Sequence, residues 1–144
     1  FFNTENGAAI KAAGPTSGTG ASNVAITKNT IVRSAAGVVI GHRSNHVAVR
    51  KNLIGAQVKR VPSGAQWAAN YRAAVVGNHV TGAGNLVQSN GVWGFPDTLY
   101  LTKDSTSRIA HSNLLRATPA FNSASDCSGF KPRNAVARAF GRYS

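Results

Sequence analysis

Acidic residues, cysteine and methionine are scarce in this sequence, which has four Asp and Glu, one Cys and no Met among 144 residues. The single thiol, Cys127, excludes an intramolecular disulfide, and no histidine base adjoins it in the sequence, so we expect it to be incidental. No apolar run approaches the roughly 18 residues that span a bilayer, and the start at Phe1 lacks the basic and apolar regions of an intact signal peptide. We therefore expect no membrane span, and we expect a processed product or part of a longer chain.

The scarcity of carboxylates also narrows the possible chemistry. Only Glu5, Asp97, Asp104 and Asp126 are available, whereas glycoside hydrolysis by the usual route needs two carboxylates about 5 to 10 Å apart. Calcium-dependent chemistry needs several oxygen ligands, often carboxylates, and is disfavoured for the same reason. The sequence therefore predicts no hydrolase site, no metal site and no cofactor.

Basic residues are abundant, since sixteen Lys and Arg give a formal net charge of +12. Such a field attracts polyanions: nucleic acid, acidic polysaccharide, sulfated glycan or an acidic protein surface. The alternative is a solvated basic surface without a partner. No helix-turn-helix, zinc-finger, RRM or KH pattern is present.

A strand-like segment that ends in Asn recurs along the chain. Residues 23–31 (NVAITKNTI) and 46–54 (HVAVRKNLI) match at an offset of 23 (52 − 29) in their apolar positions, basic residue and Asn. Residues 73–80 (AAVVGNHV) and 99–105 (LYLTKDS) are assigned as further copies, each at an offset of 26. Apolar and polar residues alternate in these runs, as is typical of strands. The copies predict a ladder of inward-facing side chains at one bend, the alternative being surface turns: Asn29, Asn52, Asn78 and Asp104.

A second, glycine-led strand motif begins at Gly37, Gly64 and Gly91, 27 residues apart. Each period thus holds two short strands. Because one coil cannot bury its own inner face, we expect stacked coils that share a core. The predicted inner columns are Val24/Val47/Ala73, Ile26/Val49/Val75/Leu101 and Ile31/Ile54/Val80.

With these motifs the chain resembles the pectin-lyase-like right-handed parallel β-helix superfamily over about residues 7–118. The resemblance implies an all-β, right-handed parallel β-helix (solenoid) of about four to five coils. The coils are assigned to residues 1–118, with an uncapped N-terminal end, and residues 119–144 to a basic C-terminal tail or cap. A short helix at residues 135–140, with Asn134 as N-cap and Gly141 as stop, is predicted to cover the last coil. The superfamily includes lyases, hydrolases, epimerases, tailspikes and adhesins, so it selects no single activity.

Outward positions of the predicted coils stack into a basic stripe. Thr27, Arg50, Val76 and Thr102 are assigned to one column, and the neighbouring column holds three lysines. Since substrate commonly lies along an outer parallel sheet in the superfamily, the resemblance implies that this stripe is a groove. Residues that could serve metal-independent β-elimination as base or cation are Arg50, Lys51, His79 and Tyr100. The predicted substrate-binding residues are Lys28, Lys103, His42, Arg43, His46, Trp67, Tyr71 and Arg72. The alternatives are solvated lysines, an ordinary turn at residues 41–46 and aromatic side chains that pack in the core.

These observations lead to three hypotheses. The first is an extracellular, periplasmic or virion-associated protein that binds an acidic polysaccharide and, if it is catalytic, cleaves it by β-elimination or epimerises it. The second is a non-catalytic structural or adhesive part of a tailspike or surface assembly, which forms homo-oligomers or larger assemblies through the uncapped N-terminal end. The third is nucleic-acid binding through the basic surface.

Overall fold

The computed structural model describes residues 2–14, 17–57, 73–102, 105, 109–112, 115–116 and 131–141. Strands predominate in this part of the chain, and its one helix is a single turn, so the all-β prediction is confirmed there. The elements are β1 (Phe2–Ala13), β2 (Ala25–Thr27), β3 (Thr30–Gly41), β4 (Ala48–Arg50), β5 (Leu53–Gly55), β6 (Ala73–Asn78), β7 (Leu86–Gln88), β8 (Gly91–Trp93), β9 (Asp97–Leu101), β10 (Ala110–Ser112), β11 (Leu115–Arg116) and α1 (Ala135–Arg138).

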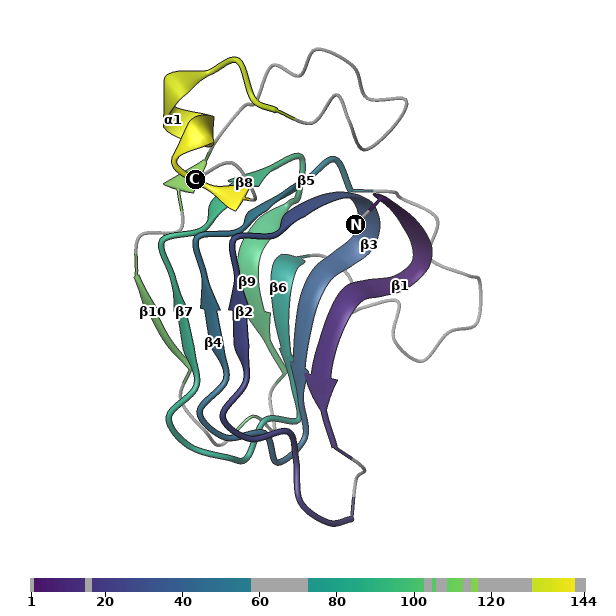
Figure 1. The fold of residues 1–144 in the computed structure, drawn as a ribbon. Helices are drawn as coiled ribbons and strands as arrows, with labels where there is room; N and C mark the ends of the chain where they lie inside the picture. Colours follow the sequence, from purple (N-terminus) through teal and green to yellow (C-terminus); the bar gives the residue numbers. More distant parts are fainter. Residues whose placement is uncertain are drawn as a thin grey trace.

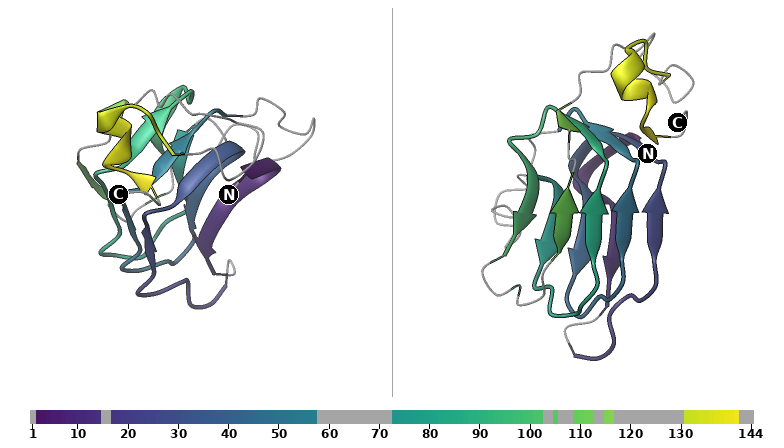
Figure 2. Two further views of the ribbon diagram at one scale, coloured as in Figure 1. Left: turned by 45° about the horizontal axis from the view of Figure 1, so that its top comes forward. Right: turned by 90° about the vertical axis from the view of Figure 1, so that its left-hand side faces the viewer.

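All pairs of these strands are parallel, and the chain returns to each sheet one strand further along. One sheet has the order β10-β7-β4-β2, and its strands lie side by side in Figures 1 and 2. In the other sheet, β5, β8 and β11 continue from the first part of β3, and β6 and β9 continue from its second part. The strand β1 pairs with β3 from Val32 to Gly41. Because β3 belongs to both parts, it carries the chain from one face to the next. The arrangement is a parallel, solenoid-like stack of coils.

The register of the sheets confirms the first two copies of the repeat and corrects the third. Ala25 pairs with Ala48, Ala48 with Leu86, and Leu86 with Ala110, so the offsets are 23, 38 and 24. The middle step is 15 residues longer than the first, which equals the number of residues in 58–72. The third copy of the Asn-ended strand is therefore residues 84–92, and residues 73–80 were misassigned.

The strand β6 belongs to a different face from the one predicted. Val75 pairs with Val38, and Asn78 with Gly41, both in the second part of β3. Gly91 pairs with Leu53, so it is not the counterpart of Gly37. The prediction for Gly64 falls outside the described residues.

Inward-facing aliphatic side chains stack from coil to coil and form one main core. Three inner columns are Ile26/Val49/Val87, Ile31/Ile54/Val92 and Val38/Val75/Leu99, and most of their members are fully buried. The parts of the predicted columns that join the first two coils are thus confirmed, but Ala73, Val75 and Val80 do not continue them. Alternation along each strand sends every second side chain into this core.

Each corner of the coil holds a residue with a left-handed backbone, and these residues recur at the same offsets as the strands. The corner columns are Asn23/His46/Gly84, Lys28/Lys51/Ser89, Arg33/Ala56/Gly94 and His42/His79, all with φ between 49° and 71°. L-residues other than glycine adopt this conformation at a cost of roughly 1–2 kcal/mol. The recurrence shows that one backbone turn is repeated at each corner with different side chains.

The C-terminal segment packs on the outside of the coils. Asn134 caps α1, since its Oδ1 accepts from the Val136 N–H at 2.8 Å, and Gly141 ends the segment with φ 77°. Both features confirm the prediction from the sequence. The segment packs through Ala137 and Phe140, which are buried against Leu53 in the second coil, whereas Val136 is 56% exposed. The helix therefore lies over β5 and β8, near the top of Figure 1, and does not cover the last coil in the way predicted.

Candidate functional site: a basic groove across three coils

A buried asparagine ladder fixes the corner that follows β2, β4 and β7. Asn52 Oδ1 accepts from the backbone N–H and the side-chain Nδ2 of Asn29, at 2.9 and 3.0 Å. Asn90 Oδ1 accepts in the same way from Asn52, at 3.0 Å for both bonds. Because each amide oxygen meets a backbone donor of the preceding coil, the ladder sets the register of the corner. The predicted ladder is thus confirmed for Asn29 and Asn52, and its third member is Asn90 in place of Asn78.

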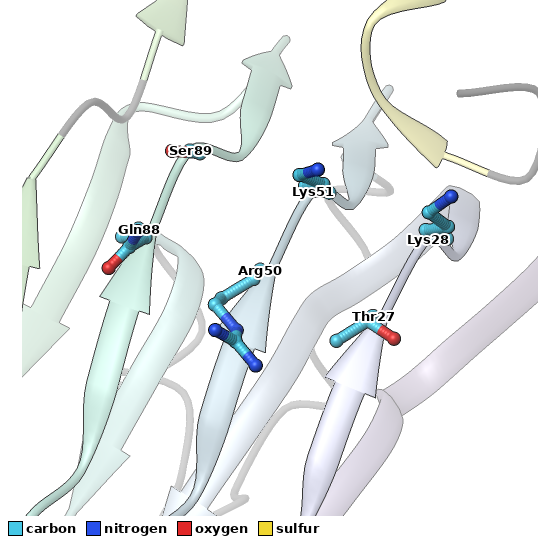
Figure 3. Close-up of a pocket in the computed structure, with 6 residues that line it drawn as sticks. All are labelled: Thr27, Lys28, Arg50, Lys51, Gln88 and Ser89. Atoms are coloured by element: carbon cyan, nitrogen blue, oxygen red, sulfur yellow. The ribbon is translucent and has the colours of Figure 1, made fainter.

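Outside this ladder lies a shallow groove of about 320 Å³. It is lined by two positions from each of three coils, and Figure 3 shows these six side chains in two rows: Thr27, Arg50 and Gln88 in one, Lys28, Lys51 and Ser89 in the other. The first row consists of the last residues of β2, β4 and β7. The second row is the corner column that precedes the ladder, where the left-handed backbone directs the side chains outward.

The groove has an uneven distribution of charge. The first two coils contribute Lys28, Arg50 and Lys51, whereas the third contributes the neutral donors Gln88 and Ser89. Paired residues on adjacent strands lie about 4.8 Å apart, and like charges at that spacing repel. No carboxylate lines the groove among the described residues. An anionic ligand would therefore relieve repulsion between these cations.

A second hollow, of about 330 Å³, lies at the corner that follows β3 and β6. It is lined by His42, Arg43, His79 and Thr81. The rings of His42 and His79 are stacked, with centroids 5.8 Å apart and planes within 5°. This hollow and the groove lie at opposite ends of β4. The turn after His42 leads into the strand, and the groove residue Lys51 follows its last residue.

The other predicted site residues lie apart from the groove or outside the described residues. Tyr100 pairs with Val76 and packs against Val39 and its neighbours on the β1–β3–β6–β9 face. The ring of His46 covers Gly84, its counterpart in the next coil, where a Cβ would lie 2.5 Å from the His46 Cδ2. The positions outside the described residues are Trp67, Tyr71, Arg72 and Lys103.

Sequence reasoning missed Gln88 and Ser89, which line the groove in the third coil. A signal for them existed. Residues 85–90 (NLVQSN) match 24–29 (VAITKN) in two apolar residues, the two polar residues that follow and the final Asn. The unequal coil length hid this match, because a constant period of about 26 residues leads to residue 78 instead.

No family model, curated protein or solved structure matches the chain. Its resemblance to the pectin-lyase-like superfamily accordingly stays a prediction. No helix in the described part of the chain is long and apolar enough to cross a membrane. Among the same residues, no three His, Cys, Asp or Glu side chains gather as metal ligands would.

Proposed function

We propose that this protein binds an acidic polysaccharide along the groove formed by Thr27, Lys28, Arg50, Lys51, Gln88 and Ser89. The observation that supports the proposal most is that cations from consecutive coils line one continuous hollow. Stacked strands lie about 4.8 Å apart, so a polymer that runs across the strands would meet side chains of a new coil at each such step. Lys and Arg suit carboxylate or sulfate groups, and Gln88 and Ser89 suit neutral hydroxyls.

Binding is better supported than β-elimination by the four residues selected from the sequence. Elimination needs a base and a cationic group within hydrogen-bond reach of one sugar unit. Arg50 and Lys51 line the groove, but His79 lines the other hollow and Tyr100 packs on a different face. The proposal is therefore a binding protein, which also fits an adhesive or structural part of an assembly.

The proposal includes the finer description of the fold as a right-handed parallel β-helix. Its support is general: connections between parallel strands in one sheet are right-handed in about 98% of cases. The parallel pairing of β2, β4, β7 and β10 is the arrangement to which that rule applies.

The test exchanges residues between coils, so that each substitution places a side chain where the fold already accepts it. The double variant Arg50→Gln, Lys51→Ser gives the second coil the groove residues of the third, Gln88 and Ser89. We expect polygalacturonate and heparin to bind the unaltered protein, and dextran not to bind. Two exposed charge contacts of about 0.2–1 kcal/mol each predict that the double variant binds about 2- to 30-fold more weakly.

Arg33→Gly is the matched control, because Arg33 is an exposed corner residue whose column contains Gly94 two coils further on. It removes a charge outside the groove and should change the affinity by less than about twofold. Isothermal titration calorimetry at fixed ionic strength measures all three proteins. Failure of both acidic polymers to bind, or an equal loss in the Arg33→Gly variant, would refute the proposal. Tighter, groove-dependent binding of duplex DNA would favour the nucleic-acid alternative instead.

A further inference from the structure

We propose that the corner hollow lined by His42, Arg43, His79 and Thr81 is a second anion site, which takes a compact tetrahedral oxyanion such as a sulfate or phosphate group. The site differs from the polysaccharide groove, because the two hollows share no lining residue among those that the structure describes. The turn that carries His42 and Arg43 precedes β4, and the groove residue Lys51 follows it. A ligand in one hollow would thus be held by different side chains from a ligand in the other.

The two imidazoles are equivalent side chains of neighbouring coils. Gly41 pairs with Asn78, so His42 and His79 follow the paired strands at the same position, and each has φ 51°. Their parallel, stacked rings are 5.8 Å apart. Both rings line the same hollow, and an imidazole carries two ring nitrogens that can bear N–H donors. The pair can therefore donate to two oxygens of one anion.

The backbone around these rings is tied down by short hydrogen bonds. The His42 N–H donates to the Asn78 carbonyl at 2.8 Å, and the Thr81 N–H donates to the His42 carbonyl at 2.9 Å. The His79 N–H donates to Thr102 Oγ1 at 2.8 Å. The buried hydroxyl of Ser44 lies 2.6 Å from the Gly41 carbonyl, which fixes the turn between β3 and β4. The site is thus organised before a ligand arrives, which lowers the entropic cost of binding.

Arg43 and Thr81 supply donors from other directions. Arg43 donates from one guanidinium nitrogen to the Gly18 carbonyl at 3.3 Å, which holds the charged group near the hollow. Arginine has five N–H donors, so others stay available to an oxyanion. The volume of about 330 Å³ is at the lower end of small-ligand sites. It leaves room for a sulfate or phosphate together with the group that it esterifies.

The distribution of charge favours an anion over a cation. No carboxylate lines the hollow among the described residues, and its charged or titratable groups are two imidazoles and one guanidinium. An anion in the hollow would lie beside the fixed positive charge of Arg43 and could accept from the imidazole N–H groups.

The experiment follows the histidine ring signals by NMR at pH 6 while sodium sulfate replaces sodium chloride at constant ionic strength. We expect saturable shifts for His42 and His79 and none for His46, an exposed corner histidine outside the hollow. His42→Asn and His79→Asn should each weaken sulfate binding about fivefold. Asparagine tolerates the left-handed backbone. The matched control His46→Asn reproduces Asn23, its counterpart in the preceding coil, and should change nothing.

Further measurements identify the source of the anion and distinguish binding at this site from binding in the groove. Binding of glucose 6-sulfate as tight as that of sulfate would support an ester group on a larger molecule, and binding of sulfate alone would support a free anion. The Arg50→Gln, Lys51→Ser variant should bind sulfate normally, so loss of polysaccharide binding and loss of sulfate binding are distinguishable. Equal, unsaturable shifts of all histidines, or equal binding of acetate, would overturn the proposal.

Discussion

The asparagine ladder predicts a steep difference between two neighbouring substitutions, Asn52→Ala and Asn29→Ala. Asn52 is fully buried, and its side chain makes four hydrogen bonds. It accepts from two donors of Asn29, and it donates to the Ile26 carbonyl at 2.8 Å and to Asn90 Oδ1 at 3.0 Å. Alanine removes all four bonds.

The magnitude follows from which partners are left unsatisfied. The Ile26 carbonyl loses a buried partner, whereas Asn90 Oδ1 keeps the Asn52 N–H. Asn29 is only partly buried and can bond to water. At about 1–3 kcal/mol for the one buried group left without a partner, and about 1 kcal/mol for the lost bonds to Asn29, Asn52→Ala should cost about 2–4 kcal/mol. Asn29→Ala removes bonds at the more exposed end of the ladder and should cost about 1 kcal/mol.

Urea unfolding followed by far-UV circular dichroism measures both values, provided that the two variants keep the slope of the unaltered protein. The comparison controls for the loss of an amide as such, since both variants lose one. Equal costs for the two substitutions, or a cost below about 1 kcal/mol for Asn52→Ala, would refute the view that the ladder holds the corner together.

Two further predictions concern the corners and the C-terminal segment. Ala56→Gly should stabilise the protein by up to about 1 kcal/mol in the same assay, because Ala56 has φ 53° and its column already contains Gly94; a loss of stability would contradict the assigned backbone. Phe140→Ala should release residues 131–141 from the coils, because Phe140 is 6% exposed and packs on Leu53, a contact worth roughly 3–5 kcal/mol. Limited proteolysis with mass spectrometry detects the release as faster cleavage near the C-terminus, whereas Val136→Ala, at a position 56% exposed, should leave the cleavage rate unchanged.

The sequence was sufficient to predict parallel strands in stacked coils but not the path of the third coil. Two neighbouring copies, 23 residues apart and with the same apolar positions, were enough to predict the register of β2 with β4. The strand Ala73–Asn78 has the same signature, an apolar run that ends in a buried Asn, yet it occupies another face. Strands on different faces of the coil all send apolar side chains into the same core. The local pattern of apolar residues therefore does not show to which face a strand belongs. The longer connection before β6 then shifted the assignment by twelve residues (90 − 78).

The candidate site was predictable where the repeat was regular. Lys28, Arg50 and Lys51 were selected from their outward positions in the first two coils, and all three line the groove. The pairing of His42 with His79 was not expected, because their separation of 37 residues matches neither of the periods seen in the sequence. It depends on the long coil, whose length is not encoded in the pattern of any single strand.

The ladder also gives the solenoid a direction. Each amide oxygen accepts from the backbone N–H of the preceding coil, so the amides cannot be turned around, and their dipoles point the same way from Asn29 to Asn90. Aligned amide dipoles strengthen one another along such a chain. The Asn29 end of the row lies at the edge strand β2, where a further coil would have to offer donors to Asn29 Oδ1. At the Asn90 end, the coil of β10 and β11 already follows β7 and β8. Two copies that met at their Asn29 ends around a two-fold axis would place two acceptors against each other, so the ladder disfavours that arrangement.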